Sequence, residues 1–171
     1  MGAEIGPAIA DAGPLIHLHE IGCLSFLQLF SVLHVPDAVW NETVGQGRVP
    51  PHQIESLDNV LRHAERGQDV QAFIDQESLD DLQYGEQACL WLLAQQEDSL
   101  VLTDDLAVRD AVKERGGTPV GSLGIVVRAY RAECIDLDRA ERLLRRLHED
   151  STLFVTEAIV DLAVEQLRRR S

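Results

Sequence analysis

Short apolar segments that alternate with stretches of helical spacing constrain the fold of this chain more than any other feature. The segments too short to be helices are predicted to be strands and lie at residues 7–10, 31–35, 99–103 and 118–120. Helical spacing extends over residues 15–30 with a break at Gly22, 36–44, 54–65, 82–96, 106–115 and 122–132. Residues 71–74 fit either a short strand or an ordered connection. The alternation predicts an α/β fold, a three-layer sandwich with about four to five parallel strands in the centre and helices on both faces.

The chain of 171 residues has the length of one domain, and it contains no repeat, low-complexity segment or visible second domain. Residues 138–148 and 156–170 are predicted to form two further helices after the alternating part of the chain. We therefore expect a single domain over residues 1–171, with a C-terminal helical addition at about residues 136–171.

Acidic residues outnumber basic ones by 29 to 15, which gives a net charge of −14. The imbalance lies in residues 1–108, which hold 18 acidic and three basic residues, whereas residues 109–171 hold 11 acidic and 12 basic ones. Coating of nucleic acid along its phosphates requires Lys and Arg, so the composition argues against a general nucleic-acid-coating protein. The surplus of carboxylates fits either a solvated acidic surface or side chains that hold cations, and only their positions distinguish the two.

The composition also bears on the compartment in which the protein works. No apolar stretch approaches the roughly 20 residues of a membrane-spanning helix, and no signal-peptide pattern is visible at the N-terminus. Cys23, Cys89 and Cys134 have no metal-binding spacing and lie among apolar residues, which predicts buried free thiols. These features predict a cytoplasmic protein without a membrane partner.

Acidic residues occupy the positions where the predicted strands end. Asp11 follows the first strand, and Asp104 and Asp105 follow the strand at 99–103. Glu42 lies in the helix that leaves the second strand, and Glu86 lies in the first turn of the apolar helix at 82–96. Because the binding crevice of an open parallel sheet lies beyond the carboxyl ends of its strands, we expect these acids to converge there.

Converging carboxylates need a positive charge between them if they are to stay ionised. No Lys or Arg stands within three positions of Asp11, Glu42 or Glu86. Hard divalent ions such as Mg²⁺ prefer carboxylate oxygens, and a pair of such ions can activate water for phosphodiester cleavage. The pattern therefore indicates metal-assisted hydrolysis. Taken singly, each acid also fits a helix cap or a partner of a helix dipole.

The ordered set of motifs resembles the PIN-domain family. The motifs are residues 9–16 (IADAGPLI), 35–42 (VPDAVWNE), 84–86 (YGE) before an apolar helix, 102–105 (LTDD) and 120–124 (VGSLG). The resemblance covers a core of about residues 8–135 and is closest to the stand-alone prokaryotic PIN proteins regarded as nucleases of toxin–antitoxin modules (VapC-like). It implies a Mg²⁺- or Mn²⁺-dependent endoribonuclease, the toxin of such a module, with RNA as substrate and an antitoxin protein as partner.

The same resemblance assigns roles to the five acids. The implied catalytic residues are Asp11, Glu42, Glu86, Asp104 and Asp105. The implied metal ligands are Asp11, Glu86, Asp104 and Asp105, and motif matching does not decide which of the last two is the direct ligand. The acidic total charge fits RNA cleavage if the substrate contacts are few and local, or if a homodimer pools its basic faces.

Several neighbours of the acids have a predicted role. Arg109 is the cation nearest to the acid pair, and we expect it to contact a substrate phosphate, although a solvated helix face is the plainer interpretation. Ser122 is expected to cap the helix at 122–132 near the pocket and, with Arg109, to contact the substrate. His17 and His19, two residues apart on a helix, are expected at the surface or at a cap rather than on a metal.

Two alternatives to the nuclease follow from the residues. The first is a binding module that keeps the fold, has lost catalysis and engages a basic partner through its acidic face. Ala12 and Gly13 stand where some relatives carry Ser or Thr, so a hydroxyl beside Asp11 is missing. The second is a phosphatase or phosphotransferase on a similar sheet, which Gly13 and the location of Lys113 inside a helix argue against.

Overall fold

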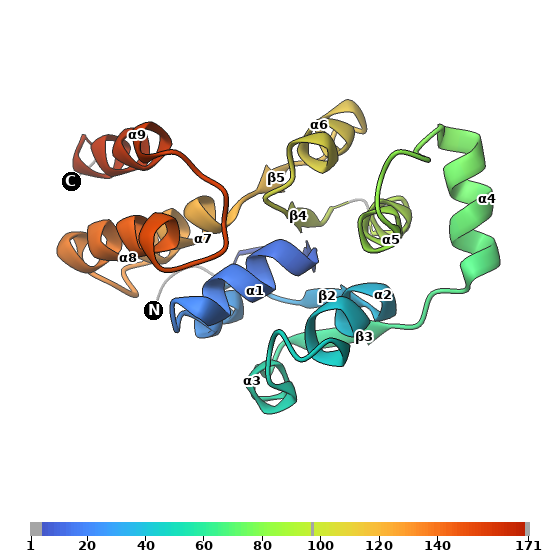
Figure 1. The fold of residues 1–171 in the computed structure, drawn as a ribbon, viewed down its shortest axis with the longest axis horizontal. Helices are drawn as coiled ribbons and strands as arrows, with labels where there is room; N and C mark the ends of the chain where they lie inside the picture. The colour runs from blue at the N-terminus through green and yellow to red at the C-terminus, as the bar shows by residue number, and fades with distance from the viewer. Residues whose placement is uncertain (1–4, 97, 170–171) are drawn as a thin grey trace.

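A five-stranded parallel sheet forms the centre of the part of the molecule that the computed structural model describes, residues 5–96 and 98–169 (Figure 1). Its strands are β1 (Ala8–Ala10), β2 (Leu33–Pro36), β3 (Val60–His63), β4 (Leu100–Leu102) and β5 (Pro119–Val120). Their order is β3-β2-β1-β4-β5, and every neighbouring pair is parallel. The predicted parallel sheet is confirmed.

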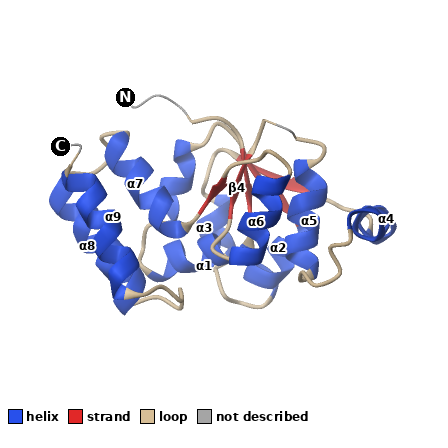
Figure 2. Ribbon diagram, turned by 90° about the horizontal axis from the view of Figure 1, so that it is seen from above, coloured by secondary structure: helices blue, strands red, loops and turns tan. Residues whose placement is uncertain are grey.

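Helices cover both faces of the sheet, as the two ribbon views show (Figures 1 and 2). One face carries α5, which packs on β1 and β2, with α2, α4 and α6 beside it. These helices are α2 (Asp37–Trp40), α4 (Gly67–Glu77), α5 (Tyr84–Leu93) and α6 (Leu106–Glu114). The other face carries a group that packs together, namely α1 (Ala12–Glu20), the 3-10 helix η1 (Leu24–Leu29) and α7 (Ser122–Arg131). The predicted three-layer α/β sandwich is confirmed.

The layer that contains α7 is extended by the C-terminal helices α8 (Leu137–Glu149) and α9 (Glu157–Arg168). Both helices pack against α7 and against each other. Their buried residues, among them Leu144 and Val164, belong to the same core as the sheet. The predicted C-terminal helices are therefore confirmed, and Arg170, expected in the second of them, lies outside the described residues.

The interpretation of residues 54–65 as one helix is wrong. Helix α3 (Pro51–Glu55) ends early, and the chain then forms β3. Strand β3 pairs with β2 alone, at the edge of the sheet, and its residues Leu61 and Arg62 are exposed. An exposed edge strand lacks the apolar run of a buried strand, so only its hydrogen bonds to β2 define it.

Two other local expectations are corrected or refined. Residues 71–74 lie inside α4, where buried Val70 and Ile74 stand one helical turn apart. The expected helix at 36–44 consists of α2 followed by one π-helical turn, η2 (Asn41–Gly45). The break at Gly22 is confirmed, because this residue has a φ of +72°.

The burial of the cysteines and the character of the helices can be compared with the sequence-based predictions. Cys23 and Cys89 are buried as expected, but Cys134, in the turn after α7, is exposed. Within the described residues, no helix combines the length and apolar character that crossing a membrane requires.

Candidate functional site

The register of the sheet places the ends of three strands side by side. Ala10 of β1 pairs with Leu102 of β4, and Leu102 pairs in turn with Val120 of β5. The next residues along these strands are Asp11, Thr103 and Gly121. They lie at the carboxyl edge of the sheet, at the point where the strand order reverses, because β2 and β3 lie on one side of β1 and β4 and β5 on the other. This point is the usual location of a binding crevice in such folds.

Asp11 is the buried carboxylate at the centre of this edge, with 6% of its surface exposed. One oxygen, Oδ1, accepts a hydrogen bond from the backbone N–H of Ala12, and Oδ2 accepts one from the Thr103 hydroxyl, each at 2.8 Å. Burial raises the pKa of Asp11, and the negative charges of Asp104 and Asp105 raise it further, against the two hydrogen bonds. Asp11 thus caps α1 and also feels the acids that follow β4.

Asp104 lies at the N-terminus of α7. Its Oδ1 accepts from the backbone N–H of Ser122 at 2.7 Å, and its Oδ2 accepts from the Ser122 hydroxyl at 2.6 Å and from Nδ1–H of His17 at 2.7 Å. Ser122 was expected to cap α7, but it is the first helical residue; the carboxylate of Asp104 binds the helix end instead. Gly121 permits this approach, because a Cβ there would lie 2.9 Å from Asp104 Oδ1.

Asp105 has a different environment from its neighbour. Its carboxylate caps α6 by accepting from the backbone N–H of Val108 at 3.1 Å, and the residue is exposed. Its negative charge nevertheless raises the pKa of both Asp11 and Glu86. Asp105 therefore faces the acids of β1 and α5, whereas Asp104 is held between α1 and α7.

Glu42 comes from the π-helical turn η2 and lies against the start of α5. Its carboxylate accepts a hydrogen bond from the backbone N–H of Gly85, and a Cβ added at Gly85 would lie only 2.4 Å from Glu42 Oε1. Glycine at this position leaves room for the carboxylate, which a Cβ would displace. Burial raises the pKa of Glu42, and so does the negative charge of Asp11.

Glu86 has a strongly raised pKa at the start of α5. It forms a capping box with Gln83, whose backbone N–H donates to Glu86 Oε2 at 2.9 Å. Burial in the first turn of α5 raises the pKa of Glu86 from its ordinary 4.5 to about 7. The charges of Asp11, Asp105 and Glu42 add to this effect, and the hydrogen bond from Gln83 opposes it.

The buried thiol of Cys89 lies close to several of these acids. Cys89 Sγ lies 3.6 Å from the carbonyl oxygen of Ala10, at the end of β1. Burial raises the pKa of the Cys89 thiol, and the negative charges of Asp11, Glu42 and Glu86 raise it further. Asp11 after β1, Glu42 of η2 and Glu86 of α5 thus lie close enough to Cys89 for their charges to act on the same thiol.

The donor set suits a hard divalent cation, because it consists of carboxylate oxygens that repel one another. None of the charges that shift the pKa values of Asp11, Glu42 and Glu86 belongs to a Lys, Arg or His. As the side chains lie, however, no group of three or more His, Cys, Asp or Glu in the described part of the chain could hold one ion together. Ion binding therefore requires side-chain rotations, which the partly exposed Glu42 and Glu86 can make most easily.

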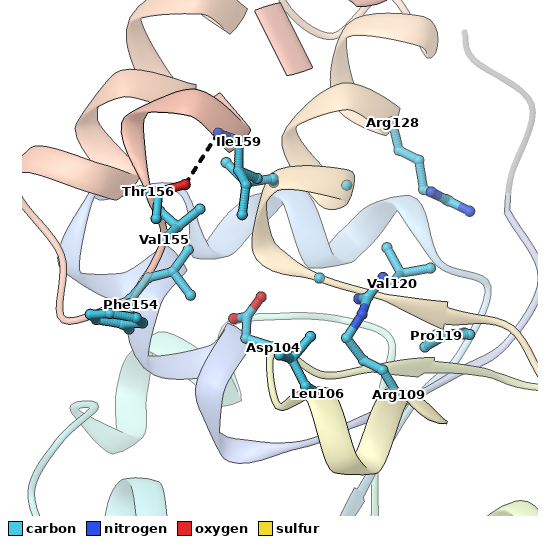
Figure 3. A pocket seen from close by; sticks show the side chains of 14 residues that line it. Asp104, Leu106, Arg109, Pro119, Val120, Arg128, Phe154, Val155, Thr156 and Ile159 are labelled. Carbon is cyan, nitrogen blue, oxygen red and sulfur yellow. Dashed lines mark hydrogen bonds between the residues drawn. The ribbon is translucent and has the colours of Figure 1, made fainter. Parts of the chain in front are cut away.

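Arg109 and a neighbouring cavity lie on the Asp104 side of the site (Figure 3). The guanidinium Nη1 of Arg109 donates to the carbonyl oxygen of Thr103 at 3.2 Å. Asp104 and Arg109 both line a cavity of about 520 Å³ that α6, α7 and the segment before α9 enclose. The cation expected near the acid pair is therefore present, beside Asp104 at the mouth of a cavity.

Two contacts at the site escaped the sequence analysis. His17 was expected at the surface or at a cap, but it is largely buried and bonded to Asp104, 87 residues away in the chain. Thr103 supplies the hydroxyl beside Asp11 that Ala12 and Gly13 lack. The role of Thr103 could have been predicted, because Thr103 lies in the motif at 102–105 next to the acid pair. The role of His17 could not, because its contact with Asp104 depends on how α1 packs against the end of β4.

Comparison with known proteins agrees with this architecture. A family model described as a PIN domain matches residues 7–169, almost the entire chain. Comparisons with curated proteins and with solved structures found no match.

Proposed function

Because this chain belongs to the PIN-domain family, whose fold is that of a nuclease, we propose that it is a metal-dependent endoribonuclease that hydrolyses phosphodiester bonds of RNA. PIN nucleases generally use divalent metal ions. The observation that carries the proposal is the set of three acids at this edge of the sheet, Asp11, Glu42 and Glu86, whose pKa values are raised by burial and by the charges of neighbouring acids, with no cation among the charges that shift them.

In this proposal each acid has a role that follows from its environment. Asp11, Glu86 and the pair Asp104–Asp105 would hold Mg²⁺ or Mn²⁺, and Glu42 would complete the negative field. Bound divalent ions would activate the attacking water and stabilise the leaving oxygen of the phosphodiester. The Thr103 hydroxyl holds Asp11, and His17 and Ser122 hold Asp104, so these hydrogen bonds restrict the rotation of both carboxylates.

Cleavage assays on purified variants test the enzymatic role. Asp11→Asn and Glu86→Gln should abolish metal-dependent cleavage of single-stranded RNA, because each removes a ligand charge. Asparagine is also a good helix cap, so the Asp11→Asn variant should keep its fold. Glu55→Gln, an exposed acid on α3, is the matched control and should cleave normally. Full cleavage by both site variants would refute the assignment.

We further propose that the nuclease is the toxin of a toxin–antitoxin module in the cytoplasm, as the similarity to stand-alone prokaryotic PIN proteins implies. Its partner would be an antitoxin protein that blocks the acidic edge. Induced expression should arrest bacterial growth, and the Asp11→Asn variant should not. Equal growth arrest by both forms would show that toxicity does not depend on the carboxylates and would contradict this proposal.

One observation favours a second candidate, a binding module that has lost catalysis. Asp104 accepts three hydrogen bonds, and the acids among the described residues do not form a ready metal-binding group. Calorimetric titration with Mn²⁺ distinguishes the two candidates. Binding that disappears in Glu86→Gln supports the nuclease, whereas no heat at millimolar Mn²⁺ supports the binding module.

A further inference from the structure

The cavity beside Asp104 combines features that the hydrolytic role alone does not use. Figure 3 shows Asp104 among the side chains that line it, with Leu106 and Arg109 of α6 on one side and Phe154, Val155 and Ile159 on the other. Its volume of about 520 Å³ falls within the range of small-molecule binding sites. Of the five acids at the site, Asp104 alone lines this cavity.

Phe154 stands at the rim with 97% of its surface exposed, the highest value among the exposed large apolar side chains of the described residues. Hydrogen bonds hold the segment before α9 that carries Phe154 in place. The carboxylate of Glu20, at the end of α1, accepts from the backbone N–H of Thr152 at 2.7 Å, and Nδ1 of His148 lies 2.7 Å from the carbonyl oxygen of Val155. A large aromatic ring held in water by fixed neighbours is expected at a binding surface.

Two arginines give the cavity a positive charge in an otherwise acidic chain. Arg109 and Arg128 both line it, and neither forms an ion pair with an acid within the described residues. Arg128 is partly buried, and burial lowers the pKa of its guanidinium. An anion would provide the missing counter-charge for both side chains.

We propose that this cavity binds one unpaired nucleotide of the RNA substrate, next to the phosphodiester bond that is cut. The base stacks on Phe154 against the apolar wall of Leu106 and Ile159, and its phosphate contacts Arg109 and Arg128. Aromatic stacking beside basic side chains is the usual mode of single-strand recognition. The proposal rests on the proposed nuclease function and makes the C-terminal addition part of substrate recognition.

A protein segment is the competing occupant, since exposed leucine and isoleucine are common at protein interfaces. Charge and location favour the nucleotide. The two arginines without an acidic partner match phosphates, and the lining of the cavity includes Asp104, an acid of the proposed cleavage site.

Binding measured without cleavage tests the proposal on the full chain. Fluorescence anisotropy in EDTA would follow a labelled, short single-stranded oligoribonucleotide of mixed sequence. Phe154→Ala should weaken its binding by about 5- to 150-fold, the range expected for loss of one stacked base, while Phe154→Trp should retain it. Leu162→Ala is the matched control, because Leu162 is 58% exposed on α9 but does not line the cavity, and its affinity should not change.

Two further measurements examine the base and the phosphate separately. An oligonucleotide with one abasic nucleotide at the bound position should bind wild type weakly, and Phe154→Ala should no longer distinguish it from the intact strand. Arg128→Gln should lower the slope of log affinity against log salt by about one, whereas Arg131→Gln, an exposed arginine further along α7, should leave the slope unchanged.

Unchanged RNA affinity in Phe154→Ala would overturn the proposal. If that variant instead altered the sedimentation of the protein, the cavity would belong to a protein interface, and the nucleotide proposal would be wrong. The two proposals can fail independently. A variant that loses cleavage but still binds RNA tests the role of the carboxylates, whereas a variant that loses RNA binding in EDTA tests the role of the cavity.

Discussion

Replacing Glu86 by glutamine should make the protein more stable at alkaline pH while it removes nuclease activity. Glu86 lies in the first turn of α5, where burial and the charges of Asp11, Asp105 and Glu42 raise its pKa from 4.5 to about 7. Glutamine keeps an oxygen that can accept the hydrogen bond from the backbone N–H of Gln83, so the capping box loses charge but not its geometry.

The magnitude follows from linkage between protonation and folding. A carboxyl group with a raised pKa in the folded state contributes stability that is complete below its ordinary pKa of 4.5 and is lost as the pH rises through about 7. The difference between these two pKa values corresponds to an upper limit of about 3.4 kcal/mol. Because Glu86 is partly exposed, solvent screening reduces this figure to about 1–2 kcal/mol in the free energy of unfolding.

Denaturant unfolding in EDTA at about pH 5 and about pH 8.5 measures the effect. Glu86→Gln should gain about 1–2 kcal/mol relative to wild type at the higher pH and much less at the lower one. The exposed acid variant Glu55→Gln should show no such dependence on pH. Saturating Mn²⁺ should then stabilise wild type, by about 2.7 kcal/mol at a concentration 100-fold above the Kd, and should stabilise Glu86→Gln far less. Equal unfolding free energies of Glu86→Gln and wild type in EDTA at the higher pH would refute the electrostatic account of the site.

Two further predictions concern positions around the acids and the edge of the sheet. Gly85→Ala should displace the flexible carboxylate of Glu42 and weaken Mn²⁺ affinity in calorimetry with little change in stability. Gly67→Ala, at a helical position where a Cβ would make only an ordinary contact with the Tyr84 hydroxyl, should leave Mn²⁺ affinity unchanged. Unaltered Mn²⁺ affinity in Gly85→Ala would remove Glu42 from the site. His34 and His63, whose ring nitrogens lie 2.7 Å apart, both have pKa values lowered first by burial, so the stability they contribute above about pH 6.5 should be lost as the pH falls below that value. Thermal unfolding should show a smaller loss between about pH 7 and about pH 5.5 in His63→Gln than in wild type, and an identical loss would contradict this reasoning.

The class of fold was predictable because buried strands carry a local signal. The residues of β1 are fully buried and form an uninterrupted apolar run, and the break at Gly22 and the end of α6 near Gly116 were visible from single residues. Strand β3 was not predictable, because its exposed residues resemble a polar helix and only pairing with β2 makes them a strand.

The positions of Asp11, Asp104 and Asp105 after strands could be predicted from the chain alone, because strand ends and acidic residues are local features. The differences between these acids depend on how the chain folds. Packing of α1 and α7 around the end of β4 gives Asp104 the donors His17 and Ser122, and burial beside other carboxylates raises the pKa of Glu86. Hydrogen bonds and desolvation act between residues that are distant in the chain, so they arise only when the sheet and its helices have assembled.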